Sequence, residues 1–135
     1  MFLNQLSFQE KRMFLDLSIH VAKANDVLSA EEKTMISQYC SEMELPPIEL
    51  YETEPLETVT DYFALADDRV KRIIMLEIYG LVYADGKFDE DEAATVDKFA
   101  ESIGMAPEEC VKIHDAIVEY YSVCVKLGEI INSDN

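Results

Sequence analysis

The chain has 135 residues, 49% of them apolar, so it is long enough to bury the core of one domain without disulfides. Its net charge of -17 excludes nucleic acid as a partner, because binding would require cationic neutralisation of phosphates, and it disfavours an anionic membrane surface. Basic protein surfaces and divalent cations remain as partners, and a solvated acidic surface that only keeps the protein soluble is the simplest alternative.

The first half of the chain predicts three helices, over residues 7–24, 29–43 and 47–50. Ser7 and Glu10 form a capping-box pattern in front of apolar residues that recur every three or four positions. Pro46 and Pro47 end the second helix, because the residue before a proline avoids helical geometry. Pro47 then suits the first turn of the short third helix.

The second half predicts four more helices, over residues 59–66, 67–82, 89–103 and 107–128. Asp67 is the expected N-cap of the second of these, which is apolar nearly all round and therefore belongs at the centre of the fold. Gly104 is the expected stop of the next helix, and Pro107 opens the last. We therefore expect a single all-α domain of about seven helices over residues 1–131, with a frayed tail at 132–135.

The last helix carries a stripe that we expect to face the core: Cys110, His114, Ile117, Tyr121 and Cys124. Cys110 and His114 lie four residues apart, which is half of a zinc site or, more simply, core packing. The sequence shows no large exposed apolar stripe that would demand a dimer, so we expect a monomer or weak dimer.

The two halves of the chain match at an offset of 60 residues without a gap. Ser7 falls on Asp67, Glu32 on Glu92, and other apolar positions and prolines correspond. The match predicts two pseudo-repeats, at about residues 7–52 and 67–128, each a helix-turn-helix unit with a short helix.

A nine-residue pattern follows the first helix of each repeat, at residues 24–32 and 84–92. In the second copy, Asp85, Asp89 and Glu92 resemble the second half of a calcium-binding EF-hand loop. Asp26 and Glu32 are the candidate metal ligands of the first copy. Too few carboxylates are present for the six to eight oxygens that calcium prefers, so any calcium or magnesium affinity should be modest.

The same pattern has a purely structural interpretation. Ser29 and Asp89 suit helix N-caps, and Glu32 and Glu92 would complete capping boxes. Gly86 suits a turn that needs positive φ. Both interpretations, metal ligands and helix caps, therefore stay open on the sequence.

The segment Ala84-Asp85-Gly86-Lys87-Phe88-Asp89-Glu90-Asp91-Glu92 resembles the signature of TerB-like domains, and the opening residues 6–15 fit the same family. That family includes bacterial tellurite-resistance proteins and the N-terminal region of some DnaJ-type co-chaperones. The resemblance covers about residues 6–121. It implies a duplicated all-helical fold, no established catalysis, suspected divalent-metal binding and a role in bacterial stress-linked protein assemblies.

Three cysteines, an odd number without a disulfide or zinc spacing, indicate a reducing compartment, and we expect a cytoplasmic protein without a signal peptide. No nucleophile or phosphate-binding motif is present, so we expect no enzyme. Glu77 is the odd carboxylate on an apolar helix face, where it marks a function, pairs with a base such as Arg72, or reaches solvent. The expected function is a non-enzymatic interaction or sensor module that meets a basic partner surface, with a divalent-metal binder as the alternative.

Overall fold

The computed structural model describes residues 1–24, 29–46, 54–83 and 90–133, and within these ranges it contains helices and no strand. The all-α class predicted from periodicity is confirmed. The helices are η1 (Leu3–Gln5, a 3-10 turn), α1 (Phe8–Ala22), α2 (Ala30–Glu42), α3 (Leu56–Ala64), α4 (Asp68–Val82), α5 (Glu90–Ser102) and α6 (Pro107–Ile131). The short helix expected at 47–50 lies outside the described residues.

The helix starts agree with the capping patterns in the sequence. Ser7 and Glu10 exchange both bonds of a capping box at the start of α1, and Ser29 and Glu32 do the same at α2. The Asp67 carboxylate accepts the backbone N–H of Val70 at 2.9 Å, which caps α4. These bonds satisfy backbone donors that have no partner within the helix, so they fix where each helix begins.

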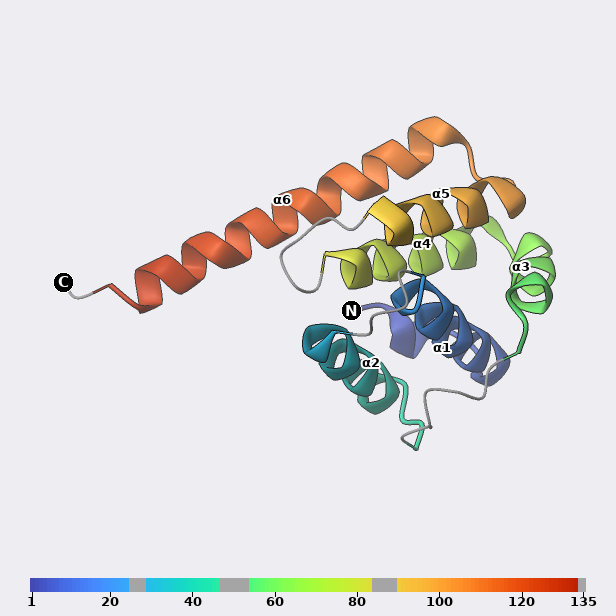
Figure 1. Ribbon diagram of the computed structural model, residues 1–135, viewed down its shortest axis with the longest axis horizontal. Coiled ribbons are helices and arrows are strands. Elements are labelled where there is room, and N and C mark those ends of the chain that lie inside the picture. Colours follow the sequence, from blue (N-terminus) through green and yellow to red (C-terminus); the bar gives the residue numbers. More distant parts are fainter. Residues whose placement is uncertain (25–28, 47–53, 84–89, 134–135) are drawn as a thin grey trace.

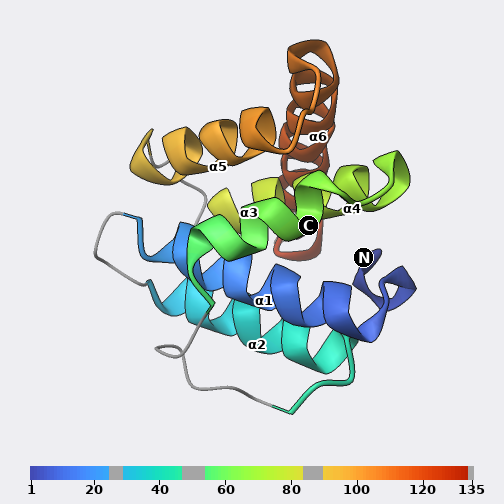
Figure 2. The ribbon, with the colours of Figure 1, turned by 90° about the vertical axis from the view of Figure 1, so that its right-hand side faces the viewer.

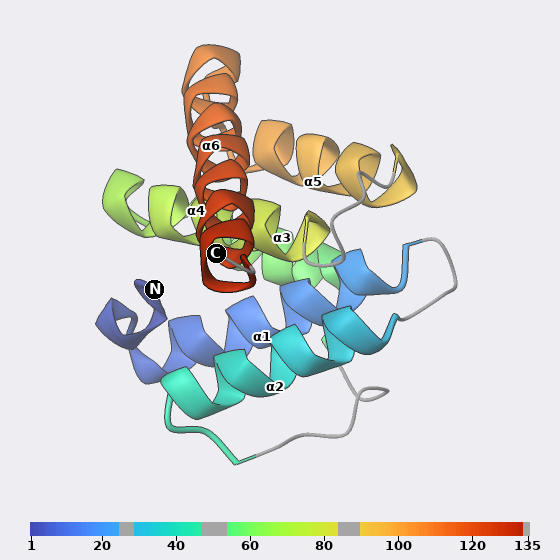
Figure 3. The same cartoon turned by 90° about the vertical axis from the view of Figure 1, so that its left-hand side faces the viewer.

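The centre of the fold is α4, as its all-round apolar sequence predicts. It packs against α1 on one side and against α5 and α6 on the other (Figures 2 and 3). The helix pair α1 and α2 forms one layer, and α3 closes the core through Phe63, whose ring meets Phe99 of α5 edge-on at 6.3 Å. Nine of the fifteen α4 residues are buried, so this helix joins the two halves of the core.

Two helices of the first half of the chain have counterparts in the second half at the 60-residue offset seen in the sequence. Helix α4 begins and ends 60 residues after α1, and α5 begins and ends 60 residues after α2. The turns that end α2 and α5 also match, with positive φ at Glu44 (58°) and Gly104 (83°). This geometry is compatible with the expected duplication, whose evolutionary origin stays a prediction.

The last helix differs from expectation. Of the five residues expected to face the core, only Ile117 is buried, and Cys124 is exposed. The C-terminal part of α6 extends beyond the rest of the molecule (Figure 1), and its apolar residues Val123, Val125, Leu127, Ile130 and Ile131 are exposed. The expectation that no apolar stripe is exposed was wrong, because periodicity identifies an apolar face without showing whether the fold reaches it.

Helices long and apolar enough to cross a bilayer are absent from the described part of the chain.

Candidate functional site

The predicted metal ligands divide into described and undescribed residues. Asp26, Asp85 and Asp89 lie outside the described residues. Glu32 and Glu92 lie in the first turns of α2 and α5, and each is only 3% exposed. Within the described ranges, no three histidine, cysteine or acidic side chains gather in a way that would hold a metal ion.

Glu32 shows the capping role in full. Its Oε1 accepts the backbone N–H of Ser29 at 3.0 Å, and the Ser29 hydroxyl accepts the backbone N–H of Glu32 at 3.1 Å. Its second oxygen, Oε2, is buried and accepts no hydrogen bond from the described residues. A buried carboxylate oxygen without a donor is costly, so the capping role accounts for one oxygen of Glu32 and leaves the other unexplained.

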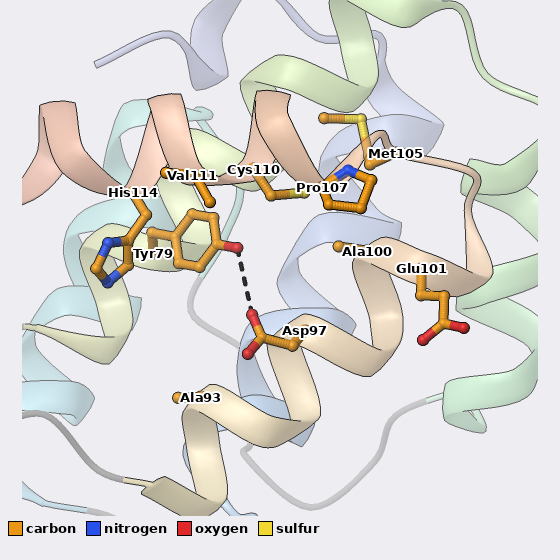
Figure 4. Close-up of a pocket in the computed structure, with 10 residues that line it drawn as sticks. All are labelled: Tyr79, Ala93, Asp97, Ala100, Glu101, Met105, Pro107, Cys110, Val111 and His114. Atoms are coloured by element: carbon orange, nitrogen blue, oxygen red, sulfur yellow. Dashed lines mark hydrogen bonds between the residues drawn. The ribbon is translucent and has the colours of Figure 1, made fainter.

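A groove of about 540 Å³ lies between α5 and the first turns of α6, over Tyr79 of α4 (Figure 4). We call it the α5–α6 groove. Its lining residues are Tyr79, Ala93, Asp97, Ala100, Glu101, Met105, Pro107, Cys110, Val111 and His114. Small and apolar side chains form most of this lining. Two carboxylates one helical turn apart contribute negative charge, and no lysine or arginine belongs to the lining.

Tyr79 and Cys110 are held in their neutral forms in the groove. The Tyr79 hydroxyl donates to Asp97 Oδ1 at 3.5 Å, and burial raises the pKa of this phenol, with further contributions from Cys110 and Asp97. Burial also raises the pKa of the Cys110 thiol, against the hydrogen bond from Tyr79, and Asp97 adds to the rise. A thiol with a raised pKa is a poor nucleophile, so the chemistry here favours binding over covalent catalysis.

His114 faces the groove from α6 and is held by aromatic neighbours. Its Nε2 lies 2.8 Å from the Tyr83 hydroxyl, and the Tyr79 ring meets the imidazole edge-on at 5.4 Å. Cys110 and His114 are each partly exposed. The core-packing alternative for this pair is therefore only half right, because both side chains also line a cavity.

Glu77 has partners that the sequence analysis did not anticipate. It is 5% exposed, and its Oε1 lies 2.9 Å from the Met1 ammonium and accepts the Phe2 backbone N–H at 2.9 Å. Glu42 binds the same ammonium at 2.8 Å. Arg72, the base suggested for Glu77, instead pairs with Glu109 at 2.6 Å. Glu77 therefore attaches the N-terminal segment to α4.

The groove carboxylates Asp97 and Glu101 were not singled out by sequence analysis. Their spacing of four residues was a readable signal, since it places both on one helix face. The apolar wall opposite them comes from α6, whose position depends on tertiary packing. Only the structure therefore reveals that the two acids border a cavity.

No family model, curated protein or solved structure matches this chain.

Proposed function

We propose that this protein is a non-enzymatic, cytoplasmic protein-interaction module of the TerB-like type, acting in a bacterial stress response. Its binding site is the α5–α6 groove, and its ligand is a partner segment that combines apolar side chains with lysine or arginine. The observation that carries this proposal is a cavity with mostly apolar walls and acidic residues at its edge, without a lysine or arginine among the residues that line it.

The size and chemistry of the groove support this ligand. About 540 Å³ lies in the range of cavities that accept several side chains. Ala93 and Ala100 keep the α5 wall low, which leaves room for a helix or an extended segment. Asp97 and Glu101 are exposed, so they can attract a cation and still leave the apolar wall to provide affinity.

The experiment is a binding titration with a defined probe. A fluorescein-labelled amphipathic peptide, with leucines at i, i+3 and i+4 and arginines between them, is titrated with the protein and followed by anisotropy. We expect saturable binding that weakens by about tenfold between low salt and about 0.15 M salt. Backbone amide shifts should localise to Ala93, Ala100 and Val111.

The matched variants separate this groove from general charge attraction. Asp97→Lys with Glu101→Lys should weaken binding by about tenfold or more, because it reverses the charge at the groove. Glu57→Lys with Asp61→Lys makes the same charge change at the same spacing on α3. Equal loss in both variants, or amide shifts spread over the whole surface, would contradict the proposed site.

A divalent-cation site is the second candidate, and the buried Glu32 Oε2 is the observation that favours it. The candidate ligands for calcium or magnesium are Glu32, Asp26, Asp85, Asp89 and Glu92. Calorimetric titration of the metal-stripped protein at about 0.15 M salt should then give saturable binding of one or two ions.

Two variants test this second candidate. At least one ion should be lost in Asp85→Asn and none in Asp61→Asn, which changes an acidic residue outside both motifs. Weak heat without saturation, the same in both variants, would leave the two motifs as helix caps.

A further inference from the structure

The exposed part of α6 carries an apolar seam. One face of this part of the helix carries Tyr120, Cys124, Leu127 and Ile131. They follow one another at spacings of four, three and four residues, which is the spacing of a single helix face. All four are exposed, with Leu127 at 53% and Ile131 at 79%. We call these four residues the α6 seam.

The seam continues a pattern that begins against the protein's own core. Ile113 and Ile117 lie at the same heptad spacing before Tyr120, and both pack against the core. Val123 and Ile130, also exposed, flank the seam and widen it. Of the polar residues of this segment, Ser122 and Glu129 lie opposite the seam, and Glu119 and Lys126 lie along its Val123–Ile130 edge. Such a segment has the pattern of one strand of a coiled coil.

Charge favours a second copy of this same segment as the occupant. Residues 118–131 hold two glutamates and one lysine, a net charge of -1, although the whole chain carries -17. The overhanging half of α6 is therefore the part of this acidic molecule that another copy can approach with little repulsion. An antiparallel arrangement also places the two acidic bodies at opposite ends of the contact, whereas a parallel one brings them side by side.

We propose that the protein forms a two-fold symmetric dimer in which two α6 seams pack antiparallel. The seam is self-complementary in one register, which sets Cys124 beside the partner's Leu127 and Tyr120 beside the partner's Ile131. Every contact then occurs twice, as two-fold symmetry requires. This inference uses a different surface from the α5–α6 groove and does not depend on the proposed function.

The area available suits a weak dimer. Residues 118–131 span about 21 Å of helix. Five exposed large apolar side chains of this length lie on the seam or beside it, namely Tyr120, Val123, Leu127, Ile130 and Ile131, and they are 46–79% exposed. Two such segments together therefore remove roughly 600 Å² of apolar surface from water, which is the size of a weak, concentration-dependent contact.

Analytical ultracentrifugation of the full chain, from micromolar to sub-millimolar concentration at about 0.15 M salt, tests the association. We expect a monomer–dimer equilibrium that Leu127→Glu weakens by at least about a hundredfold, because it would bury a charge in the seam. Val125→Glu adds the same charge to the same segment on the opposite face and should leave the equilibrium within about threefold. Circular dichroism checks that both variants stay helical.

The salt dependence separates this dimer from the groove interaction. Screening should strengthen an association between two acidic copies, whereas it should weaken binding of a basic peptide. A chain that stays monomeric over the whole concentration range, or a Val125→Glu variant that dissociates as readily as Leu127→Glu, would overturn the proposed dimer.

Cysteine cross-linking tests the orientation. In the proposed register, Leu127→Cys places a new thiol beside the partner's Cys124, so diamide oxidation should yield disulfide-linked dimers. Adding Cys124→Ser to that variant should slow the cross-link, because the two facing thiols are no longer present. Cross-linking of the unmodified chain through two Cys124 thiols as fast as that of Leu127→Cys would indicate parallel helices and would overturn the antiparallel arrangement.

Discussion

At the scale of single residues, the buried carboxylates of this acidic protein have separate structural roles. Glu32 completes a helix cap, and Glu77 holds the N-terminal segment. Asp16, in the interior of α1, accepts the Glu54 backbone N–H at 3.3 Å. A buried acid in this chain is therefore not by itself evidence of catalysis, because each of these three carboxylates already accepts a backbone donor.

Removing the cap of α2 should destabilise the protein. Ser29→Ala deletes the oxygen that accepts the Glu32 backbone N–H, so the free energy of unfolding should fall by about 1 kcal/mol. Urea unfolding measures the change. Ser41→Ala, at an exposed position near the end of the same helix, is the control and should change stability by less than about 0.5 kcal/mol. Equal stability of Ser29→Ala and the parent would argue against the cap as the role of this motif.

Asp16→Asn should stabilise the protein at neutral pH. Burial raises the pKa of the Asp16 carboxyl, although the Glu54 backbone bond opposes the rise, so folding favours the protonated acid. The contribution of the acid to stability is complete below its ordinary pKa of 3.8 and is lost as the pH rises through the folded-state pKa. The gain should be a few tenths of a kcal/mol, because the hydrogen bond from the Glu54 backbone partly offsets the cost of burying the charge.

The pH dependence distinguishes this effect from a change in packing. Denaturant unfolding of Asp16→Asn and the parent should show a difference near pH 7 that shrinks toward about pH 4. A constant difference over this range would attribute the gain to packing or helix propensity rather than to the charge.

At the scale of elements, α2 and α5 end in the same turn with different residues. The backbone N–H of Leu45 donates to the Cys40 carbonyl at 2.9 Å, and Met105 donates to Ala100 at 3.0 Å. Both turns require one residue with positive φ, which glycine adopts without strain and glutamate does not. The sequence therefore places Gly104 at the relaxed turn and Glu44 at the strained one.

Removing the glycine from one turn and introducing a glycine into the other should change the free energy of unfolding in opposite directions. Gly104→Ala should lower the free energy of unfolding by about 1 kcal/mol, because the methyl group disfavours this φ. Glu44→Gly should raise it by up to about 1 kcal/mol, less the entropy that glycine adds to the unfolded chain. Thermal and urea unfolding of both variants provide the measurement. A destabilised Glu44→Gly would show that the Glu44 side chain contributes more than its backbone strain costs.

At the scale of the whole molecule, stability should fall as the solution becomes alkaline. Hydrogen bonds to Glu42 and Glu77 outweigh partial burial and raise the pKa of the Met1 amino group above its ordinary 8.0, and burial raises the pKa of Tyr39 and Tyr79 above 10.0. Each group binds its proton more tightly when folded. The contribution of each group to the free energy of unfolding is therefore complete below its unfolded-state pKa and is lost as the pH rises through its folded-state pKa.

The loss should begin above about pH 8 and steepen above about pH 10, reaching about 1 kcal/mol for each buried tyrosine by about pH 11. Urea unfolding at intervals across this range measures it. Tyr39→Phe removes one buried phenol, so its stability should fall less steeply above about pH 10 than that of the parent. Parallel slopes in the two proteins would contradict the assignment to Tyr39.

The sequence by itself determined the helices, their caps and the 60-residue offset, because these depend on residues within one or two turns of each other. Ser7 with Glu10 and Ser29 with Glu32 are readable without knowing what the helices contact. The central position of α4 was also readable, since a helix that is apolar on nearly every face must be covered on nearly every face.

Only the tertiary structure decided the functional surfaces, because they depend on contacts between residues far apart in the chain. The partners of the Glu77 carboxylate lie 75 or more positions away, and the walls of the α5–α6 groove come from three helices. The exposure of Leu127 and Ile131 follows from where the body of the molecule ends along α6. Periodicity shows which face of a helix is apolar, but only packing shows whether this protein covers that face itself or leaves it for a partner.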